Sequence, residues 1–361
     1  MKNEFMNVPI FPGEGKVYFE ERKIPTPSDN QLLIQAKANL LCGSDRNQFY
    51  NGTPKCIPGH EGAGVIVEKG KNAKFEIGMK GAVYLYDYCN KCRSCQLGLT
   101  NQCLHKNCDY GFNVDGAFCE YYLVNDYVFF PVDESVDVIN ATLLLDVMGT
   151  GGHATKRAQL IHKDIQSVLI NGAGPIGLGL LAMSKLTFAK DLPVLINDVK
   201  SSRLPLAKKM GGLPIDLSKH SLQEGMEEYG IKNPDVAIDA TGKAIARKSA
   251  LNALAKRGVM VMVGNGEGLD FEQYPDMGAP ERSILGSEYF SYNEMEENHE
   301  LLKNNQEYLS QIITHQYNII DVQKSYEHFF SPDSDAGKIE VVHNLIALLG
   351  LTTYSYSLQE Q

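Results

Sequence analysis

Residues 168–186 read VLINGAGPIGLGLLAMSKL, an apolar run that ends in glycines and continues into a segment of helical character. Gly172, Gly174 and Gly177 have the spacing G-x-G-x-x-G, and Asp198 ends the next apolar run, 21 residues after Gly177. A strand, a glycine-rich turn, a helix and an acid about 20 residues further on form the dinucleotide-binding fingerprint in the context that it requires.

This turn predicts how a dinucleotide would be held. Small residues let the backbone approach a pyrophosphate, and a helix that begins at Pro175 and Ile176 offers free N–H groups and positive potential. Asp198 can accept hydrogen bonds from an adenosine ribose and would repel a 2′-phosphate, which favours NAD. Lys200 and Arg203 lie close by in the sequence and could offset part of that charge, so NADP stays open. The alternative is a turn that only packs the helix on the strand.

The chain after about residue 167 alternates apolar runs with helix-length segments, as at DVAIDATG (235–242) and GVMVMVGNG (258–266). This alternation predicts βαβ units and a doubly wound parallel sheet, an α/β fold. Thr241 and Gly264 follow two of these runs. Because strand ends of such a sheet line the ligand crevice, we expect both residues to contact the cofactor, with simple turn chemistry as the alternative.

The first 155 residues have a different pattern, in which short β-like runs are separated by Gly and Pro turns. The clearest runs are QLLIQAKANLL (31–41), EGAGVIVEKG (61–70) and EYYLVNDYVFFPV (120–132). Their composition and spacing predict a β-rich part ahead of the α/β part.

Length and composition limit the class of protein. A chain of 361 residues suggests two or three domains, and 43% hydrophobic with 22% charged residues is ordinary globular composition. Lys and Arg number 34 against 44 Asp and Glu, a formal net charge of −10, which argues against a nucleic-acid partner. The start of the chain lacks a secretory pattern, and there is no apolar run of about 18 residues. We therefore expect a cytoplasmic protein without a membrane partner.

Four of the eight cysteines lie within fifteen residues and have the spacing C-x2-C-x2-C-x7-C: Cys89, Cys92, Cys95 and Cys103. Four thiolates at such intervals can close around one tetrahedral Zn²⁺ with no open position, which makes a structural site. An iron–sulfur cluster uses the same ligands, and free thiols are the third alternative. The long chain and the missing secretory signal argue against a disulfide framework.

A second set of metal-binding residue types is dispersed along the chain. It consists of Cys42, His60 and Asp146, with Ser44 and Glu61 close by in sequence. Taken singly, Cys42 is a core thiol, His60 is a loop histidine, and Asp146 is a helix-capping or surface acid. Taken together, a thiolate, an imidazole and a carboxylate form a three-ligand zinc set with an open fourth position. Their spacing alone does not decide between the two interpretations.

Over nearly its whole length the chain resembles the zinc-dependent medium-chain alcohol and polyol dehydrogenases. The GHE segment and the cysteine lobe are specific, and the order of all the motifs along one chain is more specific still. The segments that carry the resemblance are CGSD (42–45), GHEGAGVIVEKG (59–70), the four-cysteine lobe, DGAFCEY (115–121), GTGGHA (149–154) and GAGPIG (172–177) with Asp198.

The resemblance implies that Cys42 and His60 bind a catalytic zinc, with Glu61 beside the metal as a neighbouring group or an exchanging ligand. The third ligand of the family is a Cys or Glu at the place where this chain has Asp146. Aspartate is a departure, yet it can ligate zinc at about 2.0–2.2 Å. It makes the ligand set richer in oxygen, as in the polyol and sugar branch of the family.

The resemblance also places Ser44 against the substrate oxygen, as the first member of a proton relay. Many relatives end this relay with a histidine shortly after the CG[ST]D segment, where this chain has Arg46, Asn47 and Gln48. Because Asn47 does not titrate near neutral pH, we expect a pH dependence without a relay-histidine ionisation.

The implied activity is hydride transfer between a small hydroxylated substrate (a polyol, sugar or secondary alcohol) and NAD(P). Two Zn²⁺ per chain are implied, of which the catalytic one would lower the pKa of the substrate hydroxyl. One alternative is a threonine-type dehydrogenase that oxidises an amino alcohol. Another is a non-catalytic nucleotide-binding protein with structural zinc only. A zinc-ribbon nucleic-acid binder is disfavoured by the charge.

The resemblance further implies an irregular, chaperonin-like β-barrel as catalytic domain, with substrate bound in the cleft between domains. We expect residues 1–155 to form the first part of that domain, with its zinc lobe at 89–103. Residues 156–288 would form the dinucleotide-binding domain, and residues 289–361 would return to the catalytic domain. The tail, 352–361, is expected to be frayed or locally packed. Relatives suggest a homodimer or homotetramer.

Overall fold

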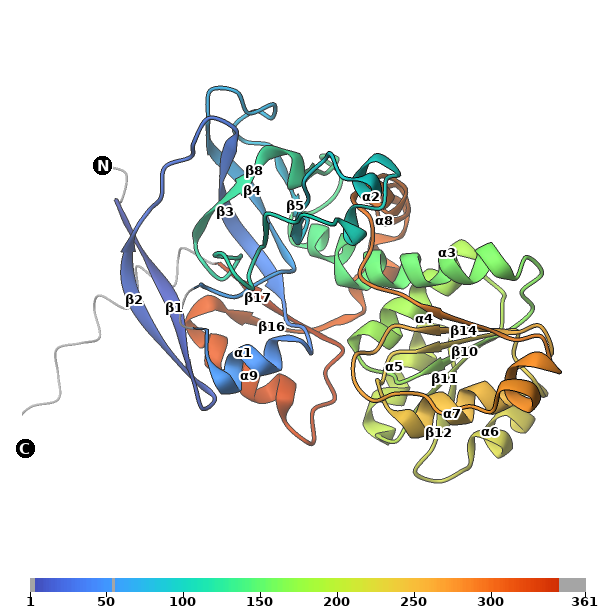
Figure 1. The fold of residues 1–361 in the computed structure, drawn as a ribbon. Coiled ribbons are helices and arrows are strands. Elements are labelled where there is room, and N and C mark those ends of the chain that lie inside the picture. The colour runs from blue at the N-terminus through green and yellow to red at the C-terminus, as the bar shows by residue number, and fades with distance from the viewer. Residues whose placement is uncertain (1–3, 54–55, 344–361) are drawn as a thin grey trace, which may run out of the picture.

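The computed structural model of the protein describes residues 4–53 and 56–343. The described chain forms a β-rich half and an α/β half that lie side by side (Figure 1). The β-rich half contains segments from both ends of the described chain, and the α/β half comes from its middle. The predicted tail, 352–361, lies outside the described residues.

The α/β half is built on a six-stranded sheet in the order β12-β11-β10-β13-β14-β15. Every neighbouring pair is parallel, and β10 lies between β11 and β13, so the strand order turns back at β10. This confirms the predicted doubly wound sheet, whose ligand crevice forms where the order reverses. The strands are β10 (Val168–Asn171), β11 (Val194–Asp198), β12 (Leu213–Asp216), β13 (Val236–Asp239), β14 (Val259–Met262) and β15 (Ser283–Gly286).

Helices cover both faces of this sheet because successive strand residues point to opposite sides. Val168 and Ile170 belong to one hydrophobic cluster with α3, α4 and α5, whereas Leu169 belongs to another with α6 and α7. Each such fully buried side chain contributes about 1.5–3 kcal/mol. The helices are α3 (Gly151–Ile161), α4 (Pro175–Thr187), α5 (Leu204–Lys209), α6 (Leu222–Glu228) and α7 (Ala244–Ala253).

The β-rich half is built on a seven-stranded sheet in the order β16-β17-β3-β4-β5-β9, with β8 also paired to β3. The last two strands of the described chain therefore join a sheet made from its first part, with β17 antiparallel to β3. The strands are β3 (Gln31–Leu40), β4 (Gly62–Lys69), β5 (Lys80–Val83), β8 (Tyr121–Asn125), β9 (Phe129–Pro131), β16 (Ile313–Asn318) and β17 (Lys338–Val342).

The apolar run 120–132 forms two strands. A 3₁₀ turn at Asp126–Val128 separates β8, which pairs with β3, from β9, which pairs with β5. The turn lets one stretch of chain pair with two non-adjacent strands of the sheet.

The remaining elements complete this half. Two-stranded sheets are formed by β1 with β2 and by β6 with β7, and α9 packs near β16 and β17. These elements are β1 (Phe5–Gly13), β2 (Lys16–Lys23), β6 (Tyr86–Asp87), β7 (Cys108–Asp109), α1 (Asp45–Asn51), α2 (Arg93–Gln96), α8 (Met295–Ser310) and α9 (Val322–Phe330).

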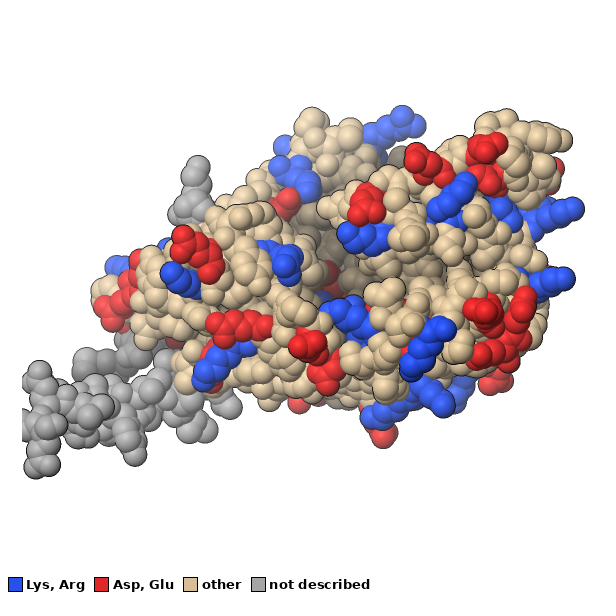
Figure 2. All heavy atoms as spheres, turned by 90° about the horizontal axis from the view of Figure 1, so that it is seen from below, with Lys and Arg blue, Asp and Glu red and all other residues tan. Residues whose placement is uncertain are grey.

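No helix in the described ranges is long and apolar enough to cross a membrane. Viewed from below, the molecular surface is hollowed between the two halves (Figure 2). The domain boundaries at 155/156 and 288/289 stay predictions.

Candidate active site

The dispersed metal-type residues meet at one end of the β3–β4 pair. Asn39 of β3 lies opposite Gly62 of β4, so Cys42, just after β3, and His60, just before β4, emerge at the same edge. Asp146 comes from a separate element, a π-helical turn at Asp146–Thr150 that leads into α3. One ligand atom from each of Cys42, His60, Glu61 and Asp146 lies within 4.8 Å of all the others.

The donor atoms of this cluster suit a cation. The thiol of Cys42 donates to Asp146 Oδ2 at 3.1 Å, and His60 Nε2 lies 3.8 Å from the same oxygen. Asp146 Oδ1 and Glu61 Oε2 are buried and have no hydrogen-bond partner. Buried carboxylate oxygens without partners are costly unless a cation lies beside them. A sulfur, a nitrogen and carboxylate oxygens form a donor set that fits Zn²⁺.

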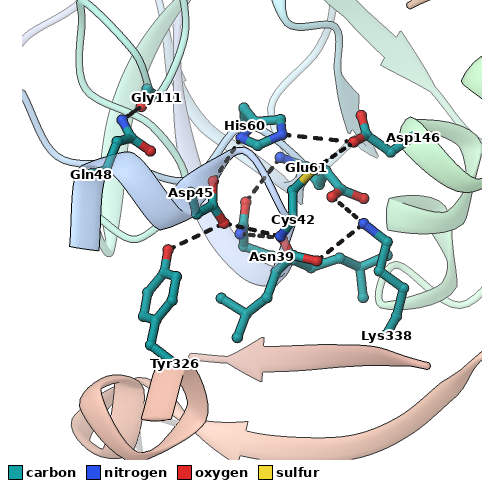
Figure 3. A network of polar contacts seen from close by, with 12 residues as sticks. Asn39, Cys42, Asp45, Gln48, His60, Glu61, Gly111, Asp146, Tyr326 and Lys338 are labelled. Atoms are coloured by element: carbon teal, nitrogen blue, oxygen red, sulfur yellow. Dashed lines mark hydrogen bonds and ion pairs between the residues drawn. The ribbon is translucent and has the colours of Figure 1, made fainter. Parts of the chain in front are cut away.

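Asp45 contacts the side chain of His60 and the backbone of Cys42 (Figure 3). Its Oδ1 lies 3.2 Å from His60 Nδ1, and its Oδ2 accepts the Cys42 N–H at 3.0 Å and the Tyr326 hydroxyl at 3.2 Å. Burial alone would lower the pKa of His60, but Asp45 and then Asp146 raise it well above its ordinary value. With Nδ1 turned to Asp45, His60 presents Nε2 to the cluster, the usual arrangement of a metal-ligating histidine.

Lys338 is a member of the site that the sequence analysis missed. Its ammonium contacts Glu61 Oε1 and donates to the Leu41 carbonyl at 3.1 Å, and the side chain is fully buried. Burial alone would lower the pKa of Lys338, but Glu61 raises it, so the lysine is held protonated. Burial and Asp146 raise the pKa of Glu61, and Lys338 counters that rise. Lys338 lies 277 residues from Glu61 in the sequence, and a single lysine at such a distance forms no motif that would mark it.

The residues after Cys42 lead into α1, and several of them are exposed. Ser44 is exposed at the start of α1, and its hydroxyl makes no capping bond. Asn47 is exposed one turn further along and accepts a hydrogen bond from Asn51 at 2.6 Å. Arg46 lies over the rings of Tyr50 and Phe330, at 4.9 and 5.3 Å from their centroids.

The glycine turn lies between β10 and α4, where the strand order reverses. Gly172 has φ +93, which favours glycine, and a Cβ at Gly177 would lie 1.8 Å from the Gly172 carbonyl oxygen. At Gly174 the nearest atom to a Cβ would be Arg203 Nη1, at 3.6 Å. Gly172 and Gly177 therefore allow the turn itself. Gly174 keeps open the space beside the helix N-terminus, which fits the pyrophosphate of a dinucleotide.

Asp198 lies at the end of β11 and borders this turn. Its Oδ2 accepts the Ala173 N–H at 2.9 Å and lies 3.4 Å from Arg203 Nη1, and its Oδ1 accepts the Lys200 N–H at 2.9 Å. Pro175 and Ile176 open α4 and are partly exposed. The acid, the glycines and the helix N-terminus thus converge as the fingerprint predicts.

The four cysteines of the lobe also converge. Their sulfurs approach one another at 3.5 Å (Cys92–Cys95), 3.9 Å (Cys89–Cys95) and 3.9 Å (Cys92–Cys103). A tetrahedron with Zn–S bonds of about 2.3 Å has edges of about 3.8 Å, so the group fits one metal ion. The backbone N–H groups of Cys95 and Leu104 lower the pKa of Cys92 to about 6. A cluster of several iron and sulfide atoms would hold the thiolates further apart.

Comparison with known proteins decides the family. Residues 28–134 match the alcohol dehydrogenase GroES-like domain, and residues 175–304 match the zinc-binding dehydrogenase family. L-threonine 3-dehydrogenase of Alteromonas mediterranea is 31% identical over 341 residues, which are 90% of this chain and 96% of the relative. The chain belongs to the medium-chain zinc-containing alcohol dehydrogenase family. This dehydrogenase is accordingly a zinc-dependent NAD(P) enzyme with a GroES-like catalytic domain and a Rossmann-type sheet.

Other similar proteins have different substrates in their names. L-galactonate-5-dehydrogenase of Escherichia coli is 30% identical over 358 residues, 97% of this dehydrogenase and 99% of the relative. An alcohol dehydrogenase of E. coli CFT073, solved with NADH, superimposes with a TM-score of 0.84 at 25% identity over 94% of this chain and all (100%) of that one. The fold of 2R,3R-butanediol dehydrogenase from Bacillus subtilis is also similar, with a TM-score of 0.83 at 20% identity over 94% of this chain and 100% of that chain.

Thr241 and Gly264 have structural partners in this dehydrogenase. The Thr241 hydroxyl donates to Asp239 Oδ1 at 2.6 Å, and the Gly264 carbonyl accepts from Arg247, which also pairs with Asp239 at 2.8 Å. A Cβ at Gly264 would lie 2.4 Å from the Gly242 nitrogen. The turn chemistry that we set out as the alternative is therefore present, and cofactor contact at these two residues stays a prediction.

Proposed function

We propose that this dehydrogenase oxidises a secondary hydroxyl of a small, polar, hydroxylated substrate with NAD⁺, and that it reduces the corresponding carbonyl in reverse. The observation that carries the proposal is the cluster of Cys42, His60, Glu61 and Asp146, whose ligand atoms lie within 4.8 Å of one another beside unpartnered buried oxygens. It supports a catalytic zinc held by Cys42, His60 and Asp146. Bound zinc would supply Lewis acidity at the substrate oxygen, and bound NAD⁺ would accept the hydride.

Other residues of the chain would orient the metal ligands and transfer the proton. Asp45 orients His60 through Nδ1, and Lys338 holds Glu61 beside the metal ligands. Ser44, exposed and free of a capping bond, would take the proton of the substrate hydroxyl at its Oγ. Asn47 stands where many relatives have a relay histidine, so the proton would pass from Ser44 to water or to the cofactor ribose.

The substrate class rests on two kinds of support. The first is the oxygen-rich ligand set with Asp146, together with the exposed polar side chains of Arg46, Asn47 and Asn51 on α1, the helix that follows Cys42. The second is the similarity to a galactonate dehydrogenase at 30% identity. We therefore propose a polyol, a sugar or a sugar acid. An amino alcohol of the threonine type is the second candidate, favoured by the 31% identity to threonine 3-dehydrogenases.

We propose NAD rather than NADP as the cofactor because Asp198 places a carboxylate beside the glycine turn. Asp198→Asn keeps an oxygen that can accept the Ala173 N–H and removes the charge. We expect this variant to use NADP⁺ better relative to NAD⁺, as kcat/KM ratios would measure. An unchanged ratio would contradict the assignment of Asp198 to the ribose.

The remaining proposals are a structural zinc at Cys89, Cys92, Cys95 and Cys103, and a homodimer or homotetramer. Zinc analysis of the purified enzyme should give two ions per chain, and light scattering would give the number of chains. The sulfur distances support the structural zinc. The oligomeric state rests on the family resemblance alone.

The decisive experiment combines metal counting with a substrate screen. Polyols, sugars, sugar acids and amino alcohols would be offered with NAD⁺ and NADP⁺, and NADH formation followed by absorbance. We expect Asp146→Asn to lose one of two zinc ions and at least about a hundredfold in activity, since even outer-shell changes cost 10–100-fold. Asp191→Asn, at an exposed position, is the control. If Asp146→Asn keeps both zinc ions and its rate, the ligand assignment is wrong.

A further inference from the structure

A second His-rich cluster lies in the β-rich half, formed by three segments that the sequence analysis did not single out. His315 is on β16, His328 is on α9, and Asp335 is in the turn 331–337 that joins α9 to β17. One ligand atom from each lies within 4.8 Å of the other two. Because α9 connects the neighbouring parallel strands β16 and β17, the fold itself brings the three segments together (Figure 1).

Neighbouring hydroxyl groups orient both imidazole rings. The Tyr317 hydroxyl lies 2.9 Å from His328 Nδ1, and the Thr314 hydroxyl lies 2.9 Å from His315 Nδ1. When each Nδ1 carries the proton and donates to its hydroxyl, each Nε2 keeps a free lone pair. His328 Nε2 lies 3.7 Å from Asp335 Oδ1. Fixing one ring nitrogen by a hydrogen bond while the other binds the ion is the usual arrangement of metal-ligating histidines.

The electrostatics also favour a neutral ring at His315. The ring centroids of His315 and His328 are 4.4 Å apart, with an interplanar angle of 79°, so two protonated rings would repel each other. Burial and His328 lower the pKa of His315. Neutral imidazole is the form that binds a metal, and Asp335 contributes one negative charge.

We propose that His315, His328 and Asp335 form a third metal site, for a divalent transition ion such as Zn²⁺ or Ni²⁺, with a fourth position open to solvent. Two imidazoles and one carboxylate suit these ions, whereas Ca²⁺ and Mg²⁺ take mainly oxygen ligands. The side chains of His328 and Asp335 are 25% and 62% exposed, so the ion would exchange with solvent. This site shares no residue with the Cys42 cluster or the cysteine lobe.

An ion here would tie α9 to the turn that precedes Lys338. Two residues before His328, Tyr326 donates to Asp45, which lies beside His60. On the other side, the Pro332 carbonyl of the turn accepts from Lys200 of the α/β half at 2.7 Å. Occupancy would therefore restrain a segment that contacts both halves of the molecule.

Calorimetric titration of the untagged enzyme, dialysed until it holds two zinc ions per chain, with ZnCl₂, and separately with NiCl₂, tests the site. We expect one further ion per chain, and a rise in melting temperature when it binds. His315→Gln and His328→Gln should each weaken this binding at least about tenfold, which is 1.4 kcal/mol. His220→Gln, at an exposed position in the α/β half, should titrate as the wild type does.

Each result of this titration either supports or overturns the proposed third metal site. Binding of one ion that both histidine variants weaken and the control does not supports the site, whatever the substrate of the enzyme proves to be. No additional ion in the wild type, or equal binding by all four proteins, overturns it. Circular dichroism of each variant would show that it is folded, and Asp335→Asn provides a third variant in case one histidine variant is not.

Discussion

The ammonium of Lys338 contacts the carboxylate of Glu61, and neither side chain has any exposed surface. Lys338 begins β17, the last strand of the described chain, whereas Glu61 precedes β4. The cluster of Cys42, His60 and Asp146 is thus completed by a positive charge from the far end of the sequence. Without it, the Glu61 carboxylate would be buried close to the Asp146 carboxylate and would lose its direct ion-pair partner.

Removal of this lysine should be costly for stability. Lys338→Met leaves Glu61 buried and unpaired, and breaking a buried ion pair in this way costs about 3–5 kcal/mol. Urea unfolding of the zinc-loaded enzyme measures the loss. Lys324→Met is the control, because Lys324 is 72% exposed and its ion pair with Asp321 contributes at most about 1 kcal/mol. The double variant Lys338→Met/Glu61→Gln should recover part of the loss, and equal losses in the single and double variants would contradict this account.

The two glycines Gly174 and Gly177 should respond differently to alanine. A Cβ at Gly177 would lie 1.8 Å from the Gly172 carbonyl oxygen, so Gly177→Ala should destabilise the fold by about 1–3 kcal/mol. A Cβ at Gly174 meets only Arg203, at 3.6 Å, so Gly174→Ala should fold normally. It should weaken NADH binding at least about tenfold, about 1.4 kcal/mol. Thermal unfolding and NADH fluorescence titrations distinguish the two effects. Normal NADH binding by Gly174→Ala would show that the pyrophosphate does not bind at this turn.

The proton path should lack a histidine ionisation. Asn47 stands at the proposed relay position and is exposed on α1. The wild-type pH–rate profile should therefore show no ionisation near a pKa of about 6.5, and Asn47→His should introduce one. Profiles of kcat/KM for both proteins make the comparison. The same ionisation in both profiles would mean that another group relays the proton.

Glu340 should make the fold less stable as the pH rises. Burial, opposed in part by the amide of Gln316, raises the pKa of Glu340 from 4.5 to about 7. Between pH 4.5 and about 7, the folded state therefore keeps a proton that the unfolded state has released. The free energy of unfolding consequently falls as the pH rises through this range. Glu340→Gln removes this dependence.

The variant should match the wild type in unfolding free energy near pH 4.5 and exceed it by roughly 3 kcal/mol at about pH 8. Glu20→Gln, on the exposed face of β2, is the control and should behave as the wild type at both pH values. A constant difference between Glu340→Gln and the wild type across this range would show that Glu340 is not protonated in the folded state.

The sequence by itself determined the features that depend on local chemistry. The glycine spacing from Gly172 to Gly177, with Asp198 after the next strand, specified a dinucleotide turn because only a short list of residues permits that backbone. The spacing of Cys89 to Cys103 likewise specified convergent thiols. Motif order then indicated the family, and with it the idea that Cys42, His60 and Asp146 meet.

Only the tertiary structure decided which distant groups complete these sites. Lys338, the Tyr326 contact to Asp45 and the His315–His328–Asp335 cluster all depend on β16 and β17 pairing with a sheet built from the first part of the chain. A lone lysine or histidine has no periodicity or spacing that marks it. Its role arises from the low-dielectric surroundings and the neighbouring charges that long-range strand pairing brings to it, and these are absent from any local stretch of sequence.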